Sequence, residues 1–474
     1  MLFSSTIFIY FFLPFVLFVY YVLLRKWRKL QNLFLLAASL LFYAYGEPKF
    51  VIVMILSIIG NYIFGRLVDQ SKNQGNLKLS KTILIIAIVY NLSILFIFKY
   101  LSFVMKNIGI VMNSHFSIPE IALPIGISFF TFQAMSYVLD VYNGKGSVQK
   151  NIFNVGLYIS FFPQLIAGPI VRYQTVADQI ENRNENFEDF SNGFERFVIG
   201  LGKKVLLANN VALVADLAFN KVANGETLSI LMAWLGMICY TLQIYFDFSG
   251  YSDMAIGLGK MFGFHFLENF NYPYISTSIT EFWRRWHISL GTWFRDYVYI
   301  PLGGSRVNTQ KLIRNLFIVW LLTGIWHGAN WTYIVWGLMY FVLLAFEKVI
   351  LKKKSNNTSI NFIYWLYTII FVMIGWVIFK SDSLMAAVKY IGYLFNINRT
   401  TFIDGVFIDE LKFIKVYLSI GIICSMPIVP WLKSKIKKNI WSDSIVTIAL
   451  LGIFVLSIAS IVGSSYNPFI YFNF

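Results

Sequence analysis

Long apolar runs recur along almost the whole of this 474-residue chain, and they leave its backbone one way to fold. Inside a lipid bilayer every backbone N–H and C=O group needs a partner within the protein, so a run of about 17–25 apolar residues crosses as a helix. Hydrophobic residues make up 58% of the chain, charged residues make up 13%, and the mean hydropathy is +0.65. So small a polar minority is unable to cover a water-exposed surface. The sequence therefore predicts an all-α, polytopic integral membrane protein.

The apolar runs also give the positions of the expected helices. The first run, Ile7 to Leu24, is followed by the basic cluster Arg25–Lys29 and not by a small-residue cleavage site. We therefore expect a retained membrane helix there, and not a signal peptide. The expected helices cover residues 6–24, 31–45, 49–66, 82–104, 121–143, 154–171, 228–248, 313–327, 331–350, 360–380, 414–431 and 444–463.

The net charge of +16 is concentrated at the ends of these runs. Basic clusters fall at 25–29, 66–81, 352–354 and 433–438. Lysine and arginine gather in this way on cytoplasmic loops and beside anionic lipid headgroups, so the membrane accounts for the charge without a nucleic-acid partner. We expect these clusters on the cytoplasmic side and the loop 381–413 outside.

The two cysteines, Cys239 and Cys424, lie in apolar runs with no Cys or His at metal-ligand spacing. This spacing excludes a disulfide framework and a cysteine metal site. We expect both to be packing residues, and we expect no bound metal.

The central part of the chain differs from its flanks because prolines, glycines and polar residues interrupt its apolar runs. Broken helices persist at membrane depth when they are buried in protein or line a wet cavity. Apolar residues recur at helical spacing from Phe187 to Val205, which predicts an amphipathic helix lying along the membrane surface. In the absence of an obvious repeat we expect one membrane-embedded domain, 1–474, with a catalytic core at about 118–350 and flanking helices at 1–105 and 358–465.

His327 is the candidate catalytic residue, because it lies between two apolar runs in the segment Leu322–Asn330. A titratable imidazole at membrane depth is costly and usually functional. A neutral imidazole there can take the proton from an attacking hydroxyl group.

The other histidines rank below it. His287 has arginine and aspartate neighbours, and it is either a second functional residue or a hydrogen-bonded link in a packed element. His115 lies in a polar loop and His265 lies between aromatic residues, which favour solvated and structural roles.

Two carboxylates in the segment Tyr245–Asp253 invite an acid–base interpretation. The spacing of Asp247 and Asp253 puts them on different faces of a helix, which argues against that interpretation. The alternative is that they satisfy broken backbone or pair with basic residues, because buried charges are normally paired. The arginines considered for this pairing are Arg284, Arg285 and Arg295.

Long motifs carry a resemblance to a known family. The segments are Tyr245–Asp253, Ile279–His287, Phe294–Gly304 and Gly324–Trp331, with Met1–Ser5, Phe161–Pro169 and Asn467–Phe472 as further matches. They resemble the membrane-bound O-acyltransferases, and in particular the bacterial branch that includes the alginate O-acetylation protein. The resemblance runs from one end of the chain to the other.

This resemblance implies a helical bundle, thinned in the middle, with a passage from the cytoplasmic to the outer face near His327. It makes His327 the catalytic residue and His287 the second functional histidine. It implies transfer of an acetyl group from a cytoplasmic donor, acetyl-CoA, to a hydroxyl group of an exported polysaccharide, with no bound cofactor. It further implies an extracytoplasmic partner acyltransferase of the SGNH type and a place in the bacterial inner (plasma) membrane.

We expect substrate contacts from residues around the two histidines. Aromatic residues such as Trp326 suit a passage that excludes water. Asn330, or a backbone N–H near Gly328, can donate to a developing oxyanion. Arginines can meet the phosphates of a CoA-like donor or act only as topology determinants. The candidate substrate-binding residues are Trp326, Asn330, Arg295, Asp296 and Asp247, and the arginines considered for the donor are Arg284, Arg285, Arg295 and Arg306.

Two other classes of function remain at this stage. A transporter or flippase for lipid-linked sugars also uses broken helices and a polar site at the midplane. A scaffold without chemistry would recruit an extracytoplasmic enzyme and would need neither histidine. The sequence leaves open which polysaccharide is modified, and whether the direct acceptor is the glycan or the partner.

Overall fold

The computed structural model describes residues 1–114, 121–351, 358–435, 439–464 and 466–470. Across these ranges the chain forms helices joined by turns and loops, with no β-strand. The all-α prediction is confirmed. His115 lies outside the described residues.

The helices gather into two compact units. Unit 1 contains Met1–Val198 and Tyr251–Leu267, and unit 2 contains Ile199–Gly250 and Glu268–Phe474. The predicted single domain with a core at about 118–350 stays a prediction.

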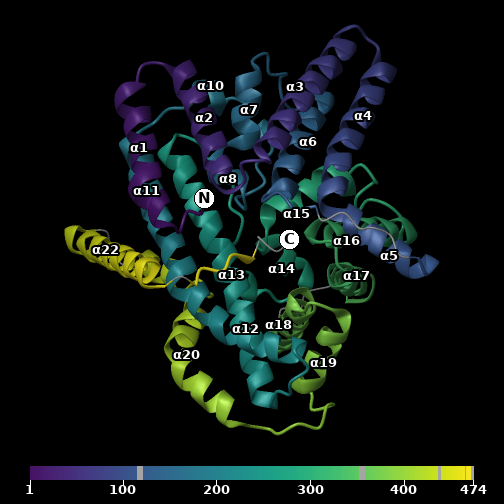
Figure 1. The fold of residues 1–474 in the computed structure, drawn as a ribbon, viewed down its shortest axis with the longest axis vertical. Helices are drawn as coiled ribbons and strands as arrows, with labels where there is room; N and C mark the ends of the chain where they lie inside the picture. The colour runs from purple at the N-terminus through teal and green to yellow at the C-terminus, as the bar shows by residue number, and fades with distance from the viewer. Residues whose placement is uncertain (115–120, 352–357, 436–438, 465, 471–474) are drawn as a thin grey trace. The chain divides into compact units, whose positions relative to one another are not determined.

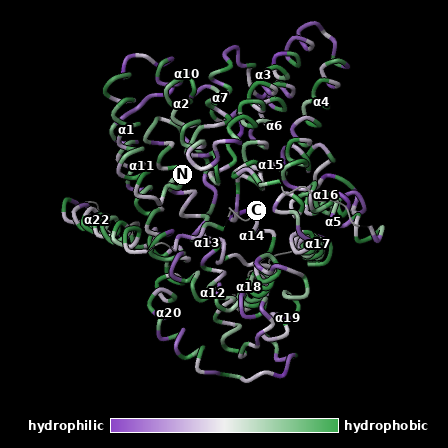
Figure 2. Tube along the Cα trace, in the orientation of Figure 1, coloured by the Kyte–Doolittle hydropathy of each residue, from purple (hydrophilic) through white to green (hydrophobic). Residues whose placement is uncertain are grey.

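In unit 1, α3, α4 and α6 pack against one another and α2 packs against α7 (Figure 1). Hydrophobic residues cover most of each long helix, and hydrophilic residues occupy the turn between α3 and α4 (Figure 2). The elements are η1 (Phe8–Phe12), α1 (Leu13–Phe18), η2 (Val19–Leu23), α2 (Arg28–Gly46), α3 (Val51–Asn73), α4 (Leu77–Leu95), η3 (Phe96–Tyr100), α5 (Leu101–Met112), α6 (Ile127–Asn143), α7 (Ile152–Ser160), α8 (Phe162–Leu165), α9 (Tyr173–Val176), α10 (Gln179–Asn182) and most of α11 (Phe187–Gly202).

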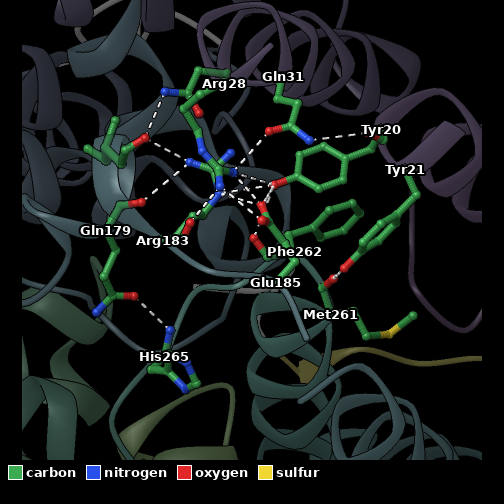
Figure 3. Close-up of polar contacts among 12 residues, drawn as sticks. Tyr20, Tyr21, Arg28, Gln31, Gln179, Arg183, Glu185, Met261, Phe262 and His265 are labelled. Atoms are coloured by element: carbon green, nitrogen blue, oxygen red, sulfur yellow. Dashed lines mark hydrogen bonds and ion pairs between the residues drawn. The ribbon is translucent and has the colours of Figure 1, made fainter. Parts of the chain in front are cut away.

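A polar network holds the start of α2 to the loop that precedes α11 (Figure 3). Arg28 pairs with Glu185, and Nε of Arg183 donates to the hydroxyl of Tyr20 over 3.0 Å. Burial alone would raise the pKa of Glu185, but hydrogen bonds from Arg28 and Tyr20 and the charges of both arginines keep that pKa below its usual range. Arg28, which was expected only as a topology determinant, therefore also fixes this loop.

In unit 2, α16 and α17 pack closely as consecutive antiparallel helices, and α14 packs against α17 and α18. The elements are η4 (Lys203–Ala208), α12 (Asn209–Ala223), the first part of α13 (Ile230–Met261), η5 (Pro273–Ile275), α14 (Ile279–Arg285), α15 (Ile288–Phe294), η6 (Arg295–Tyr299), α16 (Thr309–His327), α17 (Trp331–Phe346), η7 (Glu347–Leu351), α18 (Thr358–Lys380), α19 (Leu384–Leu394), α20 (Gly405–Cys424), α21 (Ile428–Lys435) and α22 (Ile440–Gly463).

Within the described ranges, seven helical segments are long and apolar enough to cross a membrane. They are Val51–Asn73, Leu77–Met112, Phe187–Ala223, Ile230–Met261, Trp331–Leu351, Ile360–Lys380 and Ile440–Gly463. The prediction of a multi-pass membrane protein is confirmed. The sidedness of the loops stays a prediction.

Several helices differ in extent from the expected ranges. The segment expected as 121–143 is the shorter, largely buried α6, and the segment expected as 154–171 divides into α7 and α8. Gly126 explains the first difference, because it adopts a left-handed φ of 76° just before α6 begins. The range 414–431 is also broken, between α20 and α21.

The helix expected along the membrane surface is present, but it does not stop at Val205. It continues through η4 and α12 as the candidate span Phe187–Ala223, and 61% of its apolar window is buried inside the protein. Its amphipathic pattern therefore reflects packing against protein, because a helix with one polar stripe can also bury that stripe against other helices.

Candidate active site

His327 lies where α16 ends, just before the loop to α17, and glycines let these two helices meet closely nearby. A Cβ atom at Gly324 would lie 2.6 Å from the backbone oxygen of Tyr333, and one at Gly337 would lie 2.5 Å from that of Trp320. Real Cβ atoms do not approach backbone this closely, so only glycine fits both positions. This close approach sets the position of the end of α16.

His327 is the last residue of α16, and 4% of it is exposed. Aromatic side chains surround its ring. The ring centroid lies 5.0 Å from that of Trp326, 4.9 Å from that of Trp336 and 5.2 Å from that of Phe379. These edge contacts fix the orientation of the imidazole and exclude bulk water from this side of it.

His287 is 2% exposed and forms the corner between α14 and α15. Its φ of 45° is a left-handed conformation, which is rare for a residue other than glycine. Its Nδ1 lies 3.2 Å from Oδ1 of Asn269, and the backbone N–H of Ser289 donates to the same oxygen over 3.1 Å. Because a backbone N–H can only donate, this contact identifies the acceptor atom of Asn269.

The proton of neutral His287 therefore sits on Nδ1, and Nε2 presents the lone pair. His287 lies outside the candidate membrane spans, and burial lowers its pKa to about 3. The side chain thus has one defined tautomer near neutral pH.

Trp326 contacts both histidines. Its ring centroid is 6.0 Å from that of His287 and 5.0 Å from that of His327. The two sequence-predicted histidines are therefore brought together in unit 2, with an indole ring in contact with both.

Glu347, at the start of η7, is a further residue of this region. Its carboxylate accepts the backbone N–H of Ile279 over 2.6 Å and that of Thr280 over 2.9 Å, as well as the Thr280 hydroxyl over 2.7 Å. These are the first N–H groups of α14, the helix that leads to His287. Glu347 thus anchors the His287 segment at its start.

The other predicted site residues have defined partners. Oδ1 of Asn330 caps α17 by accepting the N–H of Thr332, and Nδ2 donates to the backbone oxygen of Asp382. Nε of Arg295 donates to Asp296 over 2.8 Å. The contacts of Asn330, Arg295 and Asp296 with substrate stay predictions.

Asp247 is 1% exposed. Its carboxylate lies 2.6 Å from Nζ of Lys204 and accepts the backbone N–H of Ile470 over 2.9 Å. Asp253 pairs with Arg196 instead, in unit 1. Both carboxylates are paired as expected, but with basic residues other than the three arginines considered. The contact of Asp247 with substrate also stays a prediction.

Sequence reasoning missed Asn269, Ser289 and Glu347. Asn269 and Ser289 have no distinctive spacing, and their roles follow from contacts made across the fold. Glu347 did carry a signal, because it is a single carboxylate directly after the apolar helix Trp331–Phe346. In the described part of the chain, no group of three or more His, Cys, Asp and Glu side chains is arranged to hold a metal ion.

Comparison with known proteins gives consistent matches. Residues 145–388, which include both histidines, match the model of the MBOAT, membrane-bound O-acyltransferase, family. The chain is 39% identical to a probable alginate O-acetylase of Pseudomonas putida over 100% of both chains. It is 36% identical to a peptidoglycan O-acetyltransferase of Helicobacter pylori, covering 84% of this chain and 80% of that one. It is 30% identical to a teichoic acid D-alanyltransferase of Bacillus subtilis, covering 54% of this chain and 68% of that one.

Proposed function

Because this chain belongs to the membrane-bound O-acyltransferase family and is an O-acyltransferase, we propose that it moves an acetyl group to a hydroxyl group of an exported polysaccharide. The donor in this proposal is cytoplasmic acetyl-CoA. The similarity to two relatives named for O-acetyl transfer supports the acetyl group, and their polymers, alginate and peptidoglycan, support a glycan acceptor.

The two buried histidines in contact with Trp326 carry the proposal. In the reaction, a neutral imidazole of His327 takes the proton from the acceptor hydroxyl, and the hydroxyl oxygen attacks the thioester carbonyl carbon. The C–S bond then breaks, the thiol group of CoA leaves with a proton, and the O-acetyl ester remains. A thiolate is a good leaving group, so these steps require no metal.

His287, which also contacts Trp326, serves the same reaction. The Asn269 contact holds its Nε2 as a hydrogen-bond acceptor, which suits a residue that orients the donor or shares the proton. Of the four arginines expected to meet donor phosphates, Arg285 is paired with Glu281 and Arg295 with Asp296. Arg284 and Arg306 are exposed, and these two are the favoured phosphate contacts.

We place the protein in the bacterial plasma membrane, where a multi-pass chain meets cytoplasmic acetyl-CoA on one face. The acceptor is reached on the other face, either directly or through an extracytoplasmic partner acyltransferase of the SGNH type. If a partner is required, we expect it to co-purify with this protein from cells. Deletion of the partner should then abolish acetylation of the polymer.

The His327→Ala variant tests the catalytic assignment. We expect it to abolish thiol release from acetyl-CoA by purified protein and to remove O-acetyl groups from the surface polymer, because the acceptor hydroxyl loses its base. His265→Ala is the matched control, since His265 is a half-exposed histidine that makes no part of this site. It should retain wild-type activity.

The same measurement separates this proposal from a transporter. A flippase leaves the thioester intact. Acetyl transfer would be contradicted if the wild-type protein released no thiol while polymer export depended on the protein. Full acetylation by His327→Ala would contradict the role of that histidine.

A further inference from the structure

The helix α14 is short and ends at the strained His287 corner. It has seven residues, and the first N–H groups of any helix have no partner within the helix. The hydroxyl of Ser278 accepts the N–H of Glu281 over 3.0 Å, but the N–H groups of Ile279 and Thr280 need an acceptor from elsewhere. In apolar surroundings such groups would be costly to leave unpaired.

Glu347 supplies that acceptor from the far end of α17. Both of its oxygens are used, Oε1 by Ile279 and Oε2 by the N–H and hydroxyl of Thr280. A carboxylate is also the charge favoured at a helix N-terminus, because the helix dipole is positive there. This contact therefore fixes both the position and the direction of α14.

Further contacts show that α14 is held against one face of α17. The ring of Trp283 lies 5.5 Å from that of Trp336 and 4.8 Å from that of Tyr340. Trp336, Tyr340 and Glu347 are spaced by four and seven residues, which places them on the same face of a helix. Trp336 also contacts the ring of His327. One face of α17 thus contacts His327 near its start and the N-terminus of α14 at its end.

We propose that Glu347 is a positioning residue for acyl transfer, because it fixes α14 along α17 and so sets where His287 stands relative to His327. The inference rests on the proposed function. The contact of Glu347 with α14 matters because the backbone of His287 is left-handed. Such a strained conformation persists only where the surrounding contacts determine it. Asn269 holds the corner itself, and Glu347 holds the start of the helix that enters it.

The Glu347→Gln variant tests this role. One carboxylate oxygen becomes an NH₂ group that faces an N–H, so one anchoring bond is lost and a repulsion replaces it. We expect kcat for acetyl-CoA turnover to fall by about tenfold to a hundredfold, because a displacement of about 1 Å can cost that much, with KM nearly unchanged. A variant with wild-type kcat would overturn the proposal.

Two variants of Thr280 disturb the same contact less and can be used if Glu347→Gln folds poorly. Thr280→Val removes the hydroxyl donated to Glu347 at the same size, and Thr280→Ser keeps it. We expect a lower kcat for valine and an unchanged one for serine. Glu226→Gln is the carboxylate control in the same unit, because Glu226 forms an exposed pair with Lys221. Equal kcat values for the valine and serine variants would contradict the positioning role.

A measurement that needs no activity separates failure of this inference from failure of the proposed function. Hydrogen–deuterium exchange of the α14 amides should become faster in Glu347→Gln than in Glu226→Gln. One outcome is that the wild-type protein releases no thiol from acetyl-CoA while exchange is still faster in Glu347→Gln. In that case Glu347 does hold α14, and the proposed donor is wrong. Unchanged exchange would overturn the anchor itself.

Discussion

At the scale of single residues, the site depends on side chains that fix the two histidines and not on the histidines alone. His287 has one defined tautomer because Oδ1 of Asn269 accepts from its Nδ1 and also from the backbone N–H of Ser289. Aromatic rings of Trp326, Trp336 and Phe379 surround the imidazole of His327. Both imidazoles are thus held by neighbouring side chains.

The contact between Asn269 and His287 predicts a selective effect of Asn269→Leu. Leucine has nearly the shape of asparagine but accepts no hydrogen bond, so neutral His287 is free to carry its proton on either nitrogen. We expect kcat to fall by more than about tenfold, since a wrong tautomer can cost far more than that in other enzymes.

Ser289→Ala is the control for this experiment. It removes the hydroxyl that donates to Asn269 and lies 3.4 Å from Nδ1 of His287, and it leaves the backbone N–H of residue 289 in place to orient the amide. It should therefore keep most of the activity. Steady-state kinetics with acetyl-CoA would decide, and equal activity of the two variants would show that the tautomer is irrelevant.

At the scale of elements, the α16–α17 hairpin sets the position of His327. Gly324 and Gly337 face each other across it, and each lies where a Cβ atom would meet backbone of the other helix. Helices this close transmit any added volume directly to the loop between them, because packed interiors contain little spare room.

Gly324→Ala should therefore separate the two helices and displace His327. We expect a loss of about 1–3 kcal/mol of stability from overpacking, together with a large loss of activity. Gly291→Ala is the control, because a Cβ atom there would lie 3.7 Å from its nearest neighbour, an ordinary contact distance. Thermal unfolding in detergent and thiol release would measure both effects. Wild-type behaviour of Gly324→Ala would contradict the close approach.

Much at this scale follows from sequence, because membrane helices are specified by local hydropathy. The ranges expected near 331–350, 360–380 and 444–463 agree with α17, α18 and α22 to within a few residues. His327 and His287 were also identifiable, since ionisable groups are rare in apolar runs. Asn269 was not, and Glu347 stood out only as a carboxylate after an apolar helix, because their roles come from contacts 18 and 68 residues away along the chain. The extension of the amphipathic helix into α12 was missed for a similar reason, since a polar stripe faces water and buried partners alike.

At the scale of the whole molecule, each unit encloses ionic contacts that tie distant segments together. In unit 1, Arg28, Arg183 and Glu185 join the start of α2 to the loop before α11. In unit 2, Lys204 and Asp247 form a buried pair that also receives the segment 466–470, through the N–H of Ile470 and the backbone oxygen of Pro468. Tyr466 donates to Asp216 over 2.6 Å, which fixes the other end of that segment.

Removing one partner of the buried pair should lower the free energy of unfolding more than replacing both partners. Asp247→Ala leaves the ammonium of Lys204 buried without its partner, and we expect a cost of about 3–5 kcal/mol. Replacing both residues, Lys204→Met with Asp247→Leu, should recover part of this loss because no charge is then buried alone.

The exposed pair Lys221–Glu226 has a similar N–O distance of 2.8 Å and serves as the comparison. Breaking it should cost about 0–1 kcal/mol. Thermal unfolding of the purified variants would show the contrast, and equal costs for the two pairs would contradict the enclosed character of Lys204 and Asp247.

The helix α22 precedes this clamped segment, and only 6% of its apolar window is buried by the protein. It packs against η4, and residues 466–470 tie the chain that follows it to Asp216 and Asp247. During synthesis α22 is made before those residues, and Asp247 emerges from the ribosome long before either. The Lys204–Asp247 pair can therefore receive the backbone groups of Pro468 and Ile470 only after α22 has been synthesised, which makes docking of this segment a late step in folding.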